Sequence, residues 1–224
     1  MIKPGTRRQT KLLLGIAAYY AALWLLWWTP VVFPLRLFVV LLHEISHALA
    51  AVITGGTIER ILLHANEGGA TYTRGGNAFL IMSAGYLGSL LWGLVLIELA
   101  GTRAQVARTA LTVLAGALLI VSGLFVRNPF GFVFTVLFGA VLFSAARRLS
   151  PRAVAIVLLV LGLTSALYAL LDIRSDILMR SSLESDAHML AQMTGVPTLI
   201  WGLLWIAAGA LACWFALRRW LRRA

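Results

Sequence analysis

Charged residues and cysteine are scarce in this chain of 224 residues. Only 12% of the residues are charged, about half the share that is usual in a soluble domain, whereas 61% are hydrophobic. This balance excludes a soluble globular enzyme and a disordered chain. A single cysteine, Cys213, leaves no partner for an intrachain disulfide, so a small disulfide-stapled scaffold is excluded as well.

Acidic residues are also few, since eight Asp and Glu stand against nineteen Lys and Arg, which gives a formal net charge of +11. In a soluble chain this excess can indicate nucleic-acid binding. Here the basic residues gather at the ends of apolar runs, where they suit lipid headgroups, so we expect a lipid bilayer as partner and no nucleic acid. The main groups are Lys3, Arg7, Arg8 and Lys11; Arg147, Arg148 and Arg152; and Arg218, Arg219, Arg222 and Arg223.

The hydrophobic residues form runs of roughly 17–24 residues, each long enough to cross a ~30 Å hydrocarbon layer as a helix. They predict an all-α polytopic membrane protein with about seven transmembrane helices (six to seven) and one domain over residues 1–224. With seven spans the termini would lie on opposite sides, and nine Lys and Arg against ten would not decide the orientation. The runs cover residues 12–28, 35–53, 78–99, 106–126, 130–146, 153–171 and 197–217.

Residues 54–76 differ from the apolar runs, because three Gly-Gly pairs punctuate a stretch rich in Thr, Ile and Tyr. Residues 57–63 and 70–74 have the composition of short strands, and Asn66-Glu67-Gly68-Gly69 between them is typical of a turn. The sequence therefore predicts a short β-hairpin after the second helix. Its edge could pair with an unwound segment of another chain by strand addition, or the hairpin could simply act as a cover.

The strongest motif is His43-Glu44-Ile45-Ser46-His47, an H-E-x-x-H pattern within the second apolar run. On a helix, His43 and His47 share one face and can both bind one zinc ion. Glu44 is offset by about 100° and can hold a water beside the metal as a general base. Buried charges in a membrane span are costly unless they are compensated, and a divalent cation would compensate these residues.

Catalytic zinc usually takes a third protein ligand, which the motif does not supply. The best candidates lie in the polar segment 172–196, where Asp172 and Asp176 form an i,i+4 pair and Asp186 follows Ser185, a good N-cap for a short helix. Spacing alone does not separate these three aspartates. The remaining carboxylates and histidines outside the motif are Glu59, His64, Glu67, Glu98, Glu184 and His188, which we interpret as solvated or interfacial residues.

Three blocks of the sequence resemble the site-2 protease family of intramembrane zinc metalloproteases, in particular its compact bacterial branch without a PDZ domain. The first is His43 to Ala48 followed by Thr54-Gly55-Gly56. The second is Ser83-Ala84-Gly85-Tyr86-Leu87-Gly88, which is similar to the family's S-A-G-P motif and whose small residues we expect to pack against the zinc helix. The third is Ser185-Asp186-Ala187 with Leu190, Ala191, Thr194, Gly195 and Pro197.

One departure from the family pattern affects the metal ligands. Typical members take the third zinc ligand from an aspartate in an N-P-D-G motif, whereas this chain has Asn128-Pro129-Phe130-Gly131, and phenylalanine cannot bind zinc. The resemblance of the third block therefore implies Asp186 as the third ligand, with Asp172 and Asp176 as alternates.

The predicted function is that of a zinc metallopeptidase that cleaves membrane-protein substrates in or near their transmembrane segments, with Glu44 as general base. Two other functions compete with this prediction. A membrane transport or metal-binding protein would also place histidines and acids in its spans. A catalytically inactive relative would keep the fold without the hydrolysis.

Overall fold

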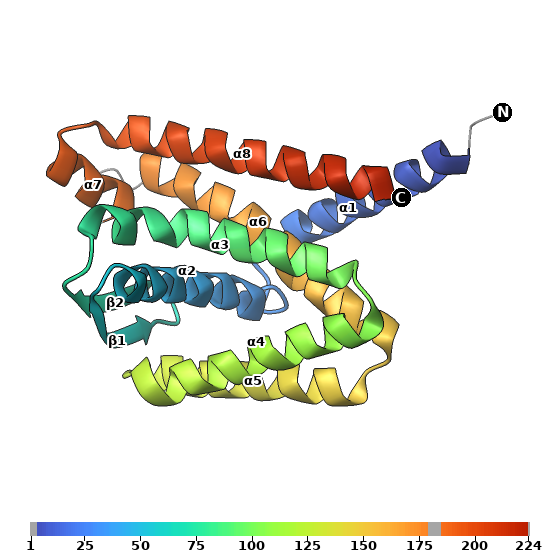
Figure 1. Ribbon diagram of the computed structural model, residues 1–224, viewed down its shortest axis with the longest axis horizontal. Helices are drawn as coiled ribbons and strands as arrows, with labels where there is room; N and C mark the ends of the chain where they lie inside the picture. Colours follow the sequence, from blue (N-terminus) through green and yellow to red (C-terminus); the bar gives the residue numbers. More distant parts are fainter. Residues whose placement is uncertain (1–3, 179–184, 224) are drawn as a thin grey trace.

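The computed structural model describes residues 4–178 and 185–223. Its elements are eight helices and two strands within these residues (Figure 1). In chain order they are α1 (Pro4–Leu25), α2 (Phe33–Ile53), β1 (Thr57–Leu63), β2 (Gly69–Arg74), α3 (Ala78–Ala100), α4 (Ala104–Phe125), α5 (Pro129–Arg148), α6 (Pro151–Leu178), α7 (Asp186–Thr194) and α8 (Thr198–Arg223). The prediction of a mainly helical protein with a hairpin after the second helix is confirmed.

Six of the described helices, α2, α3, α4, α5, α6 and α8, are long and apolar enough to cross a membrane. The chain is therefore an integral membrane protein, with the lower of the two predicted numbers of spans. The apolar run at 12–28 falls on α1, which is not one of the six. Its helix ends at Leu25 and its first turns carry Arg7, Arg8 and Lys11, so α1 lacks an apolar stretch of sufficient length.

Local signals set several helix boundaries. Pro129 and Pro151 begin α5 and α6, where the missing N–H of proline costs no hydrogen bond. The side chain of Asn77 caps α3 by accepting from the Leu80 N–H at 3.1 Å. Ser185 caps α7 in the same way, with its Oγ 3.3 Å from the His188 nitrogen, as the sequence predicts.

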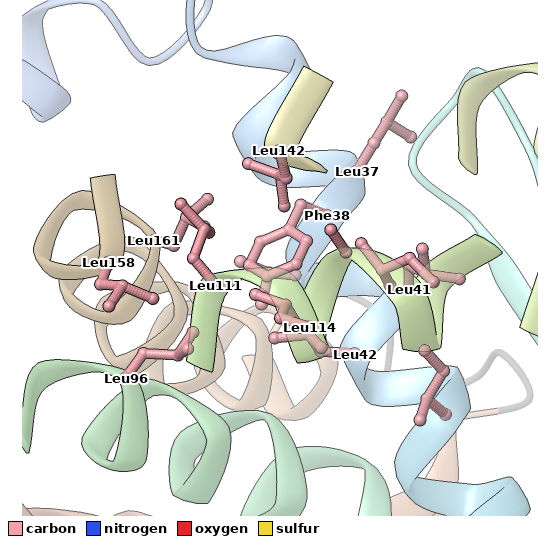
Figure 2. Packing of buried hydrophobic residues seen from close by; sticks show 14 of the residues in the cluster. Leu37, Phe38, Leu41, Leu42, Leu96, Leu111, Leu114, Leu142, Leu158 and Leu161 are labelled. Atoms are coloured by element: carbon pink, nitrogen blue, oxygen red, sulfur yellow. The ribbon is translucent and has the colours of Figure 1, made fainter. Parts of the chain in front are cut away.

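Helix α2 lies at the centre of the molecule, with α3 and α8 on one side and α4 and α5 on the other (Figure 1). Helix α6 contacts α3 and α4 and so joins the two sides. Figure 2 shows the packing around α2, where Phe38 and Leu42 meet Leu111 and Leu114 of α4. An otherwise apolar central helix thus carries four buried polar side chains, namely Arg36, Glu44, Ser46 and His47.

The hairpin follows α2 and packs back against it. Strands β1 and β2 are antiparallel, with Thr57 opposite Arg74 and Leu63 opposite Gly69. The other edge of β1 is also occupied, because the Arg127 N–H donates to the Ile61 carbonyl at 3.1 Å. The side chain of Asn128 extends this pairing, since it accepts from the Leu63 N–H at 3.0 Å and donates to the Leu63 carbonyl at 2.6 Å. Strand β2 is therefore the edge of the sheet that remains for further pairing.

The start of α1 lies beside the end of α8 (Figure 1). The side chain of Gln9 donates to the backbone carbonyl of Leu221 at 2.9 Å. The start of α1 and the end of α8 therefore lie at one end of the helix bundle. The expectation of opposite sides, which depended on seven spans, is wrong, because six crossing helices return the chain to the end from which it started.

Candidate metal centre

His43 and His47 lie one turn apart on α2, and both rings point at the same carboxylate oxygen. The Nε2 atom of His43 is 3.1 Å from Oδ2 of Asp186, and Nε2 of His47 is 3.2 Å from the same atom. Each of the three residues offers one potential ligand atom, and these three atoms all lie within 4.8 Å of one another. Among the described residues, this is the one group of three or more that could hold a metal ion.

Helix α7 brings Asp186 to the two histidines. Asp186 is the first residue of α7, and the next turn buries Ala187 and Leu190. These two side chains pack with Tyr86 of α3, Ile173 of α6 and Trp205 of α8. Apolar contacts among three membrane helices thus place an acidic residue that is distant in sequence from the motif.

Hydrogen bonding fixes the state of one of the rings. Nδ1 of His47 is 2.7 Å from the backbone carbonyl of Ile81. A carbonyl only accepts, so Nδ1 carries the proton, and in the neutral ring Nε2 then presents its lone pair to Asp186. This is the tautomer that a metal-binding histidine needs.

Asp186 is suited to bind a cation. Burial raises the pKa of this carboxyl, but the two histidines beside it, His47 and His43, outweigh burial and hold its pKa below the usual range. The carboxylate is therefore ionised at neutral pH. Its Oδ2 is buried and makes no hydrogen bond of good geometry with the described residues, although two ring nitrogens lie nearby. Two nitrogens and one oxygen that converge in this way form the donor set that zinc prefers.

Glu44 lies beside this group, under strand β2. The hydroxyl of Thr71 is 2.7 Å from Oε2 of Glu44 and 3.0 Å from its backbone carbonyl, so it can donate to either oxygen. At Gly69, a Cβ atom would lie only 2.3 Å from Oε1 of Glu44. The absence of a side chain at Gly69 therefore makes the room that the Glu44 carboxylate occupies.

A cavity of about 530 Å³ connects these groups. This volume is within the range that holds small ligands or a short stretch of peptide. One wall is Gly69 to Tyr72 of β2, and the helices contribute Met82, Tyr86 and Met189. His43, Glu44, His47 and Asp186 all line the cavity, so the polar groups meet where a substrate can reach them.

The alternate ligands are placed differently. Asp172 lines the cavity but is not one of the three residues that converge. The side chain of Asp176 lies outside the part of the chain whose side chains are described. Glu59 and Glu98 pair with Arg74 and Arg219 respectively, at 3.0 and 3.7 Å. Of the carboxylates whose side chains the structure describes, it thus brings Asp186, and not Asp172, Glu59 or Glu98, to both histidines.

The small residues of α3 make close contacts, as the sequence predicts. A Cβ atom at Gly85 would lie 2.3 Å from Nε2 of His43 and 2.6 Å from Nε2 of His47. Gly88 is packed in the same way against Ser46. Gly93 instead meets Gly162 and Ala166 of α6, so this face serves two helix contacts rather than one.

Two residues of the site are missed by reasoning from the sequence. Thr71 is a plain strand residue there, and only its place opposite α2 shows that it holds Glu44. Tyr86 is 2% exposed, and its ring centroid lies 4.8 Å from that of His43. The signal for Tyr86 was present, because it stands at the position of proline in the S-A-G-P motif.

Comparison with known proteins adds one finding. A family model described as Peptidase M50B-like matches residues 16–216. This match covers nearly the whole chain, including the H-E-x-x-H helix and Asp186. No curated protein and no solved structure matches the chain.

Proposed function

The chain belongs to the Peptidase M50B-like family, in agreement with its resemblance to site-2 proteases, and we propose that it is a zinc-dependent protease acting within the membrane. Its substrates would be membrane proteins, cut in or near their transmembrane segments. The observation that carries this proposal is the convergence of His43, His47 and Asp186 beside Glu44 in a cavity within the helix bundle. We also propose a bacterial cytoplasmic membrane as its location.

In this proposal, His43, His47 and Asp186 hold the zinc ion. The donor set, the lone pair at His47 Nε2 and the buried Asp186 Oδ2 that faces both rings all fit such a cation. When bound, zinc supplies a Lewis acid, which polarises the scissile carbonyl and lets a water lose its proton near neutral pH.

Glu44 would act as the general base. Its carboxylate accepts the proton from the attacking water and later delivers it to the amine of the leaving peptide. The Thr71 hydroxyl and the space at Gly69 hold the carboxylate in one place, because they restrict it from the side of β2. Such positioning matters, since a misplacement of about 1 Å can cost about 10²-fold in rate.

Strand β2 offers a way to present the peptide bond. A helical substrate shields its peptide groups, so the segment must unwind before it is cut. The outer edge of β1 is occupied by Arg127 and Asn128, whereas β2 forms a wall of the cavity. An unwound segment that pairs with β2 would satisfy its own backbone groups and lie next to Glu44.

The proposal is tested with Glu44→Gln in protein reconstituted in vesicles with single-span membrane proteins as substrates. Glutamine keeps the size of the side chain and an oxygen for Thr71 but accepts no proton. We expect the cleavage rate to fall by about 10²–10⁴-fold, while the zinc content stays at that of the unmodified protein.

Other outcomes of this experiment would contradict the proposal. Equal cleavage by the two forms would remove Glu44 as the base. Bound zinc without cleavage in the unmodified protein, over a broad set of substrates, would favour the inactive relative. Zinc-dependent uptake of ions into vesicles would favour the transporter.

A further inference from the structure

Arg36 carries a charge in the apolar first half of α2 and is 5% exposed. A buried guanidinium is costly in a membrane helix unless it is paired. Its Nη1 atom lies 2.8 Å from Oε1 of Glu67, at the turn of the hairpin. This pair joins the central helix to the turn that connects β1 and β2.

The surroundings of Arg36 are aromatic. Its Cζ atom lies 5.7 Å from the ring centroid of Trp27, 5.5 Å from that of Trp28 and 5.8 Å from that of Phe33. Aromatic faces stabilise a cation where water is scarce. The connection between α1 and α2 therefore holds the guanidinium in place for Glu67.

The turn has an unusual backbone conformation at Glu67, the partner of Arg36. This residue has a φ of 65°, a conformation that residues other than glycine adopt rarely. Glu67 also lines the cavity, and two residues later Gly69 lies against the Glu44 carboxylate. Glu67 of the ion pair is thus only two residues away from the glycine that packs against the proposed base.

We propose that the Arg36–Glu67 pair is a clasp that fixes the hairpin over the cavity, with both residues acting as positioning residues. By holding the turn against α2, the clasp keeps Gly69 and Thr71 at Glu44 and keeps the β2 edge beside the metal ligands. The effect on cleavage depends on the proposed function, whereas the effect on the hairpin does not.

The test uses Arg36→Met and Glu67→Gln, which remove one charge each at similar side-chain size. Glu59→Gln is the matched control, because Glu59 pairs with Arg74 on the same hairpin but at its exposed face. Amide hydrogen exchange is measured on zinc-loaded protein in lipid nanodiscs. We expect exchange at residues 64–71 to rise at least tenfold in both test variants, with α2 and the control unchanged.

Cleavage kinetics provide the second measurement. We expect kcat to fall by about 10–100-fold in Arg36→Met and Glu67→Gln, with the zinc content retained, and Arg36→Lys to keep both exchange and kcat within about threefold of the unmodified protein because it preserves the pair. If no form of the protein cleaves, the exchange measurement still decides the clasp.

Two results would overturn the clasp. One is unchanged exchange at residues 64–71 in both test variants. The other is an equal rise of exchange in the hairpin and in α2, which would show a general loss of stability instead of a released turn.

Discussion

Gly85 packs against the proposed histidine ligands, and Gly69 packs against the proposed base, Glu44. Alanine at the two positions should therefore have different effects. A Cβ at Gly85 would displace the two Nε2 atoms, whereas one at Gly69 would displace the Glu44 carboxylate. We expect Gly85→Ala to lose zinc. Gly69→Ala should keep zinc and lose about 10²-fold in kcat. Zinc content and cleavage are measured together.

Gly116→Ala provides the control for both variants. It makes the same substitution in α4, where a new Cβ would meet nothing within 4 Å. It should leave zinc and kcat unchanged. Equal loss of zinc in the Gly69 and Gly85 variants would contradict the separate roles.

Removal of the Asp186 carboxylate should weaken zinc binding more than removal of either alternate. Loss of a group that only orients a ligand costs about 10–100-fold in metal affinity, and loss of a ligand should cost more. We therefore expect the zinc Kd of Asp186→Ala to rise more than 100-fold, with smaller effects for Asp172→Ala and Asp176→Ala. Competition with a chelator measures the three affinities, and the reverse order would identify a different ligand.

At the scale of elements, Asn128 determines how the hairpin is held. Asn128→Leu removes both hydrogen bonds to Leu63 at nearly constant size. We expect a loss of about 2 kcal/mol of stability, seen as a lower unfolding temperature in detergent and faster exchange of the Leu63 amide. Unchanged exchange at Leu63 would show that the apolar contacts of β1 suffice.

The elements of this fold differ in how well their sequences predict them. The H-E-x-x-H spacing is local, so the shared face of His43 and His47 follows from one helix. The hairpin also follows from its glycines and β-branched residues. Asp186 reaches the histidines only because α6, α7 and α8 pack in a particular way, so spacing left it level with Asp172 and Asp176, and only the resemblance ranked it first.

Other features depend on long-range packing and were not predicted. Arg36 lies within the predicted span 35–53, and nothing in the sequence indicates that it is buried and paired with Glu67. The apolar run of α1 is similar to a span in composition. The contact between Gln9 and Leu221, which places the start of α1 beside the end of α8, has no signal in the sequence.

For the molecule as a whole, the start of α1 and the end of α8 lie on the same side. The basic residues are therefore divided between the two sides less evenly than the nine and ten expected for seven spans. Apart from Arg36, which is buried and paired with Glu67, twelve basic residues of the described part lie toward the end where α1 starts and α8 finishes, and four toward the end of the hairpin and α7. The twelve are Arg7, Arg8, Lys11, Arg103, Arg108, Arg147, Arg148, Arg152, Arg218, Arg219, Arg222 and Arg223; the four are Arg60, Arg74, Arg127 and Arg174. Cytoplasmic loops carry the excess of Lys and Arg, so we expect the termini in the cytoplasm.

This orientation is tested by cysteine labelling in intact cells, in a Cys213→Ala background. A membrane-impermeant maleimide should label a cysteine at Asn66, in the hairpin turn, or at Asn77, before α3. It should label one at Thr102, between α3 and α4, only after the cells are opened. The opposite pattern would place the cavity on the cytoplasmic side.

The side chain of Asn128 imitates a peptide group, and this has a consequence for substrate choice. Because Asn128 occupies the outer edge of β1, an additional strand can pair with the sheet only at β2. This pairing uses backbone amide groups, which every protein has. Such pairing depends little on the side chains of the bound segment. What would then distinguish one membrane protein from another is the ease with which a stretch of its helix frays, so glycine, proline or β-branched residues near the cut should matter more than any consensus sequence.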